Sequence, residues 1–270
     1  MKKVIGLIAA MGLMTSPLIQ AGTAITVSGS TSVTNVMEVL GETYKQATNK
    51  NVEVQGTGSS AGIRAAKDGT SMIGMSSRDI KDSEKTADTK EIVIARDGIA
   101  VTTNNQNPVQ NLTKAEISKI YRGEIKNWNE VGGENTPIVV VTRDAASGTR
   151  GAFEDIMGLK RKVNDMDVSA ITASAQVGNG NGMIKTIVAN NPYAIGYISL
   201  GSVDDSLNAL SVDGFEANDA NIATGDYAIA RPFIVMVKQD VAPQANQFID
   251  YILSEDGQKV VIEQGYISVN

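Results

Sequence analysis

The sequence predicts an α/β protein, and two observations lead to that prediction. Short apolar strands alternate with segments whose apolar residues recur at helical spacing along the 270 residues. Three of the expected strands also end in a turn of serine, threonine and glycine that opens into an expected helix. In open α/β sheets, ligands bind beyond the carboxyl ends of the strands, where helix N-termini converge. We therefore expect these turns to lie together and to form a binding site.

The first turn follows a short alternating strand at residues 24–27. Residues 28–32 read Ser-Gly-Ser-Thr-Ser, and Val33, Val36 and Met37 then mark one face of a helix. Serine is also a common N-cap, so a capped helix without any ligand fits the same pattern. The turn becomes informative because the same arrangement recurs twice.

The second turn joins a strand at residues 51–55 to a helix and reads Gly-Thr-Gly-Ser-Ser-Ala-Gly over residues 56–62. It contains two patterns known from enzymes. Gly-x-Gly-x-x-Ala is a form of the dinucleotide-binding fingerprint, with Asp79 as the acidic residue downstream, and Gly-x-Ser-x-Gly around Ser60 is a nucleophile elbow. A lone fingerprint carries little weight, and the elbow lacks a general base because the chain has no histidine.

The third turn has the clearest chemistry for binding an anion. An apolar strand leads into a loop with Ser147, Gly148 and Thr149, and apolar residues at helical spacing follow. Free N–H groups and the dipole at a helix start attract anions, and Gly148 allows a close backbone approach. Arg143 and Arg150 bracket the loop, and guanidinium binds oxyanions through paired hydrogen bonds. The alternative is a capped helix with two solvated arginines.

Further strands are expected at residues 71–75, at residues 230–237 and in two short pieces within residues 91–103, on either side of Asp97 and Gly98. The first of these strands runs into Ser77 and Arg78, which places another arginine at a strand end. The polar segment at residues 104–108 indicates a break and a hinge.

The composition excludes several classes of function. The formal net charge is −6, and no basic cluster with interleaved aromatic residues occurs, so no nucleic-acid partner is expected. The chain has no histidine and no cysteine. Zinc, copper and haem sites therefore lose their usual ligands, and Ser-His-Asp and Cys-His catalysis are impossible. We expect a binding protein rather than an enzyme, with no metal and no cofactor.

The N-terminus has the pattern of a secretory signal peptide. Lys2 and Lys3 precede an apolar stretch over residues 4–14 that is too short to span a membrane comfortably. Cleavage after Ala21 fits the small residues there, and cleavage after Ala24 is the alternative. Because no cysteine is present, a lipid-modified N-terminus is excluded. We expect a periplasmic protein that is not a lipoprotein.

Taken together, these segments resemble the PstS-type phosphate-binding proteins, the periplasmic components of phosphate ABC importers. The resemblance covers the mature chain and rests on the three turns and on the segments at residues 74–79 and 97–101. It implies a two-lobed periplasmic-binding-protein fold of type II, with phosphate bound between two α/β lobes. The lobes would be joined by crossovers near residues 102–105 and 228–231. The implied divisions are a signal peptide at 1–21, lobe I at 22–103 and 231–270, and lobe II at 104–230.

The resemblance also implies which residues bind phosphate. Long family members have an aspartate where this chain has Ser77, and that aspartate accepts the proton of hydrogen phosphate. The acceptor here is expected to be Asp97 or Asp79, or a backbone carbonyl. Arg150 is left outside the set because it lies inside the helix. The implied phosphate-binding set is Ser30, Thr31, Ser32, Ser59, Ser77, Arg78, Arg143, Ser147, Gly148 and Thr149.

The implied function is high-affinity capture of inorganic phosphate by a monomer and its delivery to the membrane permease subunits of an ABC importer. Three alternatives stay open. The site could take another oxyanion such as sulfate, molybdate or tungstate, because the usual aspartate is replaced by Ser77. The chain could be a phosphate-scavenging surface or matrix protein, or an exported enzyme that uses Ser60.

Overall fold

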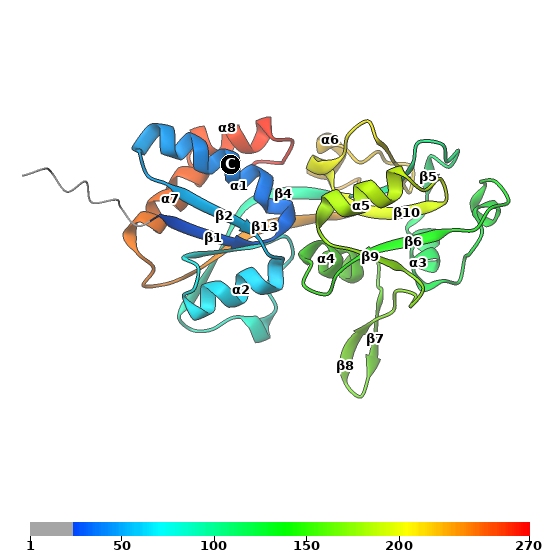
Figure 1. Ribbon diagram of the computed structural model, residues 1–270, viewed down its shortest axis with the longest axis horizontal. Helices are drawn as coiled ribbons and strands as arrows, with labels where there is room; N and C mark the ends of the chain where they lie inside the picture. Colours follow the sequence, from blue (N-terminus) through cyan, green and yellow to red (C-terminus); the bar gives the residue numbers. More distant parts are fainter. Residues whose placement is uncertain (1–23) are drawn as a thin grey trace, which may run out of the picture.

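The computed structural model describes residues 24–270, which form two α/β lobes side by side (Figure 1). The lobes are joined through two long strands, β4 (Thr89–Asn104) and β13 (Ala230–Lys238). The expected signal peptide at residues 1–21 lies outside the described residues. Within the described part, no helix combines the length and the apolar character needed to cross a membrane.

Lobe I is a mixed sheet covered by helices on both faces. Its strand order is β2-β1-β3-β13-β4, in which β1 pairs in parallel with β2 and β3, and β13 runs antiparallel to β3 and β4. The remaining elements of this lobe are β1 (Ile25–Gly29), α1 (Thr31–Thr48), β2 (Val52–Gly56), α2 (Ser59–Asp68), β3 (Ile73–Ser76), a 3₁₀ turn (Asp82–Glu84), α7 (Pro243–Leu253) and α8 (Glu255–Glu263).

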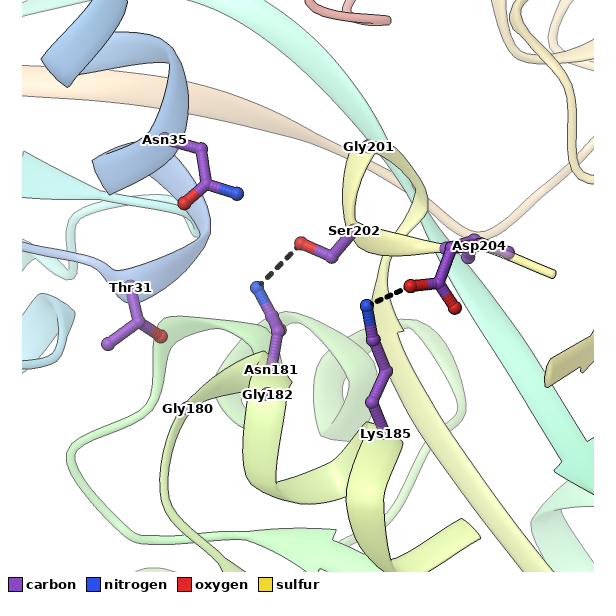
Figure 2. Close-up of a pocket in the computed structure, with 10 residues that line it drawn as sticks. Thr31, Asn35, Gly180, Asn181, Gly182, Lys185, Gly201, Ser202 and Asp204 are labelled. Atoms are coloured by element: carbon purple, nitrogen blue, oxygen red, sulfur yellow. Dashed lines mark hydrogen bonds and ion pairs between the residues drawn. The ribbon is translucent and has the colours of Figure 1, made fainter. Parts of the chain in front are cut away.

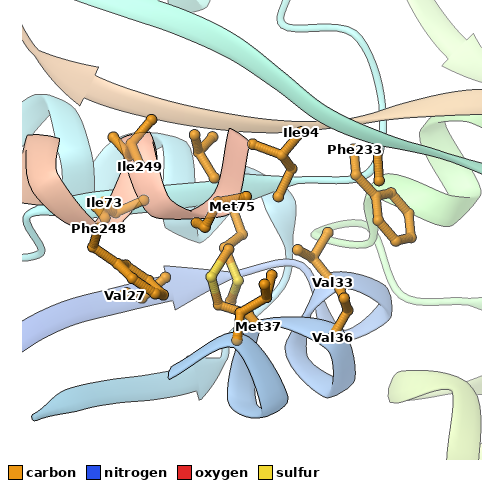
Figure 3. Close-up of a cluster of buried hydrophobic side chains, with 14 of the residues drawn as sticks. Val27, Val33, Val36, Met37, Ile73, Met75, Ile94, Phe233, Phe248 and Ile249 are labelled. Carbon is orange, nitrogen blue, oxygen red and sulfur yellow. The ribbon is translucent and has the colours of Figure 1, made fainter. Parts of the chain in front are cut away.

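Different helices pack on the two faces of this sheet, as the alternating directions of the β13 side chains show. Phe233 and Val235 point into a core shared with α1, α7 and α8, whereas Ile234 and Met236 pack with residues of α2. Successive side chains of a strand point to opposite faces, so a strand covered on both sides is apolar throughout. Figure 3 shows the larger core, where Phe233 lies beside Val33 of α1.

Lobe II continues the same sheet in the order β4-β10-β6-β9, with β11 paired to β4. One face packs on α3 and α4 through the stacked rings of Phe153 and Tyr197, and the other packs on α5. A hairpin of β7 and β8 projects away from the lobe (Figure 1).

The elements of lobe II have the following bounds: β5 (Asn111–Leu112), α3 (Lys114–Arg122), a 3₁₀ turn (Trp128–Val131), β6 (Val139–Arg143), α4 (Gly148–Ile156), β7 (Lys160–Val163), β8 (Met166–Ser169), β9 (Gln176–Gly178), α5 (Gly180–Ala189), β10 (Ala194–Ser199), a 3₁₀ turn (Leu200–Ser202), β11 (Leu207–Ala209), β12 (Ser211–Val212) and α6 (Asp219–Thr224).

The strand β4 differs from its sequence prediction. Two short pieces were expected around Asp97 and Gly98, but the structure has one continuous strand of 16 residues. The strand β4 pairs with β13 as far as Gly98. From Ile99 onward it pairs with β10 instead. The ladder continues because a new partner takes over where the old one ends, so the glycine does not terminate the strand. This position is the first crossover between the lobes.

The second crossover lies at Ile229 and Ala230, where the chain enters β13 opposite Gly98. The sequence predicted this crossover near residues 228–231. The first crossover precedes the expected one near residues 102–105, because that segment is still paired inside lobe II. We therefore propose that lobe I ends at residue 98 rather than at residue 103.

A buried ion pair holds the two crossover strands together. Arg231 donates to Asp97 from Nε (3.0 Å) and Nη2 (2.7 Å), and Ser199 of β10 donates to the same oxygen at 2.9 Å. Complete burial raises the pKa of Asp97, while the guanidinium and the hydroxyl act in the opposite direction. Both side chains of the pair are nearly inaccessible to solvent.

Replacing Asp97 with asparagine is expected to lower the free energy of unfolding by about 3–5 kcal/mol, because it leaves the buried Arg231 guanidinium without a counterion. Equilibrium unfolding in urea measures this loss. The matched control is Glu263→Gln, which removes an exposed pair with Lys259 and should cost less than about 1 kcal/mol. Equal losses in the two variants would contradict the assigned role of the buried pair.

Candidate oxyanion-binding site

The three turns predicted from the sequence meet between the lobes. Ser30 is the N-cap of α1, Ser59 begins α2 and Ser147 is the N-cap of α4. Hydrogen bonds join the lobes at this point, among them one between the hydroxyls of Ser32 and Thr149 (2.9 Å) and one from the Ser60 N–H to the Ala146 carbonyl (3.2 Å). Three helix N-termini therefore converge on one place, where each contributes free N–H groups and a positive dipole end.

Gly148 lets the lobes approach this closely. A Cβ atom at this position would lie 2.0 Å from Ser59 Oγ and 2.7 Å from Ser77 Oγ, both of which belong to lobe I. Contacts this short do not occur between real side chains, so only glycine permits the observed approach of α4. The described conformation is a closed one.

Arg143 brings an uncompensated positive charge to the site. It ends β6, is 1% exposed, and donates from Nη1 to Asn181 Oδ1 (2.7 Å) and from Nη2 to Thr31 Oγ1 (2.8 Å). Its Nε has no partner, and no carboxylate of residues 24–270 pairs with it. Burial, reinforced by nearby Arg231, lowers the pKa of Arg143 to about 10. A buried cation without a counterion favours binding of an anion.

Four hydroxyl groups around the site share a hydrogen-bonding pattern. Each one accepts a hydrogen bond from a donor of the protein, so its own proton is left to be donated elsewhere. A ring of such hydroxyls is suited to the oxygens of a tetrahedral anion. The four bonds are to Thr31 from Arg143 Nη2 (2.8 Å), to Ser59 from the Ser77 N–H (3.1 Å), to Ser77 from the Ser30 hydroxyl (2.8 Å) and to Ser147 from the Arg150 N–H (3.2 Å).

Comparison with known proteins shows which family the chain belongs to. A family model described as a PBP superfamily domain matches residues 17–256. The phosphate-binding protein PstS of Bacillus subtilis is 34% identical over 257 residues, which cover 93% of this chain and 82% of that protein. The chain belongs to the PstS family of phosphate-binding proteins. The resemblance inferred from the sequence is thereby confirmed.

Solved structures of proteins described as phosphate transport components share the fold. A putative phosphate ABC transporter substrate-binding protein from Clostridium perfringens, with bound phosphate, superposes with a TM-score of 0.86 at 45% identity and covers 92% of this chain and 100% of that one. An ABC-type phosphate transport receptor from Vibrio cholerae superposes with a TM-score of 0.76 at 43% identity, with coverages of 90% and 99%. The predicted two-lobed α/β class is confirmed.

Arg78, which the sequence placed in the phosphate-binding set of this PstS-family chain, has another partner. Its guanidinium makes two 2.7 Å hydrogen bonds to the carboxylate of Glu84 and also contacts Ser60 and the Asp79 carbonyl. The charge of Arg78 is therefore already compensated, and its stem packs against Gly151 of lobe II. For this reason Arg78 is left out of the phosphate-binding set that we propose below.

The two expected proton acceptors are not brought to the hydroxyl ring. Asp79 is exposed, and Asp97 is buried in its pair with Arg231. Arg231 in turn donates to the backbone carbonyl of Ser77 (3.2 Å), so the buried pair contacts the ring through the backbone of Ser77. Asp97 accepts hydrogen bonds from Ser199 and Arg231 and from none of the ring hydroxyls. Within residues 24–270, no group of acidic side chains could hold a metal ion.

Arg150 braces the loop, as its place inside the helix suggested. Its Nε pairs with Glu154 (2.8 Å) and its Nη1 donates to the Arg143 carbonyl (2.9 Å). It fixes the end of β6 from behind, and its charge is shared with a carboxylate one helical turn away.

The sequence interpretation missed Asn181, which contacts Arg143 from the first turn of α5. It also lines a pocket of about 490 Å³ between the lobes, together with Thr31 and Asn35 of α1 and Ser202 (Figure 2). The available signal was the glycine-rich turn Gly-Asn-Gly-Asn-Gly at residues 178–182, a fourth turn that follows a strand and opens a helix.

Proposed function

We propose that this chain captures inorganic phosphate and delivers it to the membrane permease subunits of an ABC importer. The observation that carries the proposal is Arg143, a buried cation without a counterion inside a ring of hydroxyl donors. The relatives named as phosphate-binding proteins and the related structure with bound phosphate support the same ligand. The proposal further takes the protein to be a periplasmic monomer, without a lipid anchor and without enzymatic activity.

The proposed phosphate-binding residues are those that the structure brings together. Arg143 supplies the charge, and Gly148 supplies a backbone N–H at the start of α4. Ser30 supports the ring by donating to Ser77. Arg78, Asp79 and Asp97 are left out because of their placements. The hydroxyl groups that complete the proposed set are those of Thr31, Ser32, Ser59, Ser77, Ser147 and Thr149.

Isothermal titration of the mature protein with phosphate tests the ligand directly. We expect one phosphate per chain at high affinity, and the absence of heat at any phosphate concentration would reject the proposal. Size-exclusion chromatography tests the monomer, and fractionation of the producing cells tests the periplasmic location.

A second oxyanion is a candidate because no carboxylate reaches the hydroxyl ring. A carboxylate in a binding site repels an anion that has no proton to share, and this repulsion is a way to reject sulfate. Ser77 can donate to either anion. Titration with sulfate, molybdate and tungstate in competition with phosphate distinguishes the candidates, and preferential binding of one of them would replace phosphate as the proposed ligand.

The pH dependence of phosphate binding follows from Arg143. Burial lowers the pKa of Arg143 to about 10 by favouring its neutral form, whereas a bound anion favours the charged form. Phosphate affinity should therefore fall as the pH rises through about 10, where the guanidinium loses its proton. Titrations across this range measure the fall, with circular dichroism to verify that the protein stays folded. An affinity that does not change through this range would contradict the assignment.

A further inference from the structure

Asn181 connects the buried cation to the opposite lobe. Asn181 is only 7% exposed and lies in the first turn of α5 in lobe II. Its Oδ1 accepts from Arg143, and its Nδ2 donates to Ser32 Oγ of lobe I (3.2 Å) and to Ser202 Oγ (3.2 Å). Figure 2 shows the amide directed towards Ser202 at the edge of the interlobe pocket.

The partner of Arg143 differs in charge from the partners of the other buried arginines. Arg78 pairs with Glu84, and Arg231 pairs with Asp97. Arg143 meets the amide of Asn181 instead, which accepts a hydrogen bond without cancelling the charge. The positive charge is therefore held in a fixed orientation and left for a ligand to neutralise.

The Asn181 amide also determines which groups donate and which accept in its hydrogen bonds to Arg143, Ser32 and Ser202. A guanidinium can only donate, so Oδ1 must face Arg143 and Nδ2 must face the hydroxyls of Ser32 and Ser202. Ser32 then accepts from the amide, and its own proton is directed to Thr149 or to a bound anion. Ser32 thereby acquires the same donor character as the four hydroxyls of the ring.

We propose that Asn181 is a positioning residue that makes the site specific for anions, by orienting Arg143 without neutralising it and by turning the Ser32 hydroxyl into a donor. This inference rests on the proposed phosphate site. A carboxylate at the same position would reverse both effects, because it would neutralise Arg143 and would accept from Ser32. The unliganded protein would then carry an internal counterion where the ligand is needed.

The variants Asn181→Asp and Asn181→Ala test the proposal, with Asn35→Asp as the matched control. Asn35 lines the same pocket and is exposed, and its side chain makes no hydrogen bond to Arg143. The control therefore adds the same negative charge beside the site without the contact on which the proposal depends. Phosphate affinity is measured by isothermal titration, and thermal melting is measured without phosphate.

For Asn181→Asp we expect phosphate affinity to fall at least about thirtyfold while the melting temperature without phosphate rises, because Arg143 gains a buried counterion. Asn181→Ala should lower affinity by only about tenfold and should lower the melting temperature. Asn35→Asp should stay within about threefold of the parent affinity. Affinity and melting temperature thus move in opposite directions only in Asn181→Asp, which a merely structural role would not produce.

Two results would overturn the proposal. One is an Asn181→Asp variant that binds phosphate as the parent does, and the other is a fall in its melting temperature equal to that of Asn181→Ala. If the parent protein itself binds no phosphate, the proposed function fails. The melting temperatures, recorded without phosphate, still report in that case whether Asn181 leaves Arg143 uncompensated.

Discussion

Replacing Arg143 with glutamine is expected to weaken phosphate binding by about 30-fold to several thousand-fold. Truncating one member of a buried, hydrogen-bonded charge pair costs about 2–5 kcal/mol, and about 1.4 kcal/mol is a tenfold change in affinity. We expect the loss to lie towards the upper end of this range, because the nearby arginines Arg78, Arg150 and Arg231 each pair with a carboxylate and Arg143 does not. Isothermal titration measures the loss.

Arg143→Lys separates charge from geometry. Lysine keeps the positive charge but loses the forked donors that contact Thr31 and Asn181, so an intermediate affinity is expected. The melting temperature of Arg143→Gln without phosphate should not fall, since the substitution removes a buried cation that has no counterion. A loss of affinity accompanied by an equal loss of stability would instead indicate that Arg143 serves the fold.

The second large effect is expected from Gly148→Ala. The added Cβ would lie 2.0 Å from Ser59 Oγ in the closed conformation, so the lobes could close only after the turns had shifted. Overpacking of this kind costs about 1–3 kcal/mol, which lowers phosphate affinity by about fivefold to about 150-fold. Because the clash is between lobes and not within one, the unfolding midpoint should change little.

Gly182→Ala is the matched control for this variant. Gly182 also lies in the first turn of a helix, in α5, and a Cβ atom there meets nothing within 4 Å. The same chemical change should therefore leave both affinity and stability close to those of the parent. Small-angle scattering with phosphate should show a compact particle for Gly182→Ala and a more open one for Gly148→Ala. Equal affinities in the two variants would refute closure as the cause.

Much of the site could be predicted because its parts are local in sequence. The turns before α1, α2 and α4 each show a strand end, hydroxyl residues and a helix start within a few positions. The rule that ligands bind beyond the carboxyl ends of strands then brings them together. Arg143 belongs to the same local pattern, since it ends the strand β6 that leads into one of the turns.

The features that the sequence did not predict depend on contacts that no local pattern contains. The partner of Arg78 is Glu84, which a short 3₁₀ turn brings back to it. The continuity of β4 depends on β13 and β10, which lie far along the chain. The strand β13 pairs with the first part of β4, and β10 pairs with the second part. Asn181 was missed because its turn carries asparagine and glycine rather than the hydroxyl residues that mark the other turns. Its importance comes from one contact with Arg143.

The paired crossover strands set the mechanical stiffness of the molecule. β4 and β13 remain hydrogen-bonded up to Gly98 and Ala230, so the lobes are connected by a two-stranded ribbon and not by two independent loops. Rotation of one lobe must twist that ribbon, and the elastic energy of twisting rises with the angle. Neither crossover can move without the other, so opening and closing are coupled to deformation of this one ribbon.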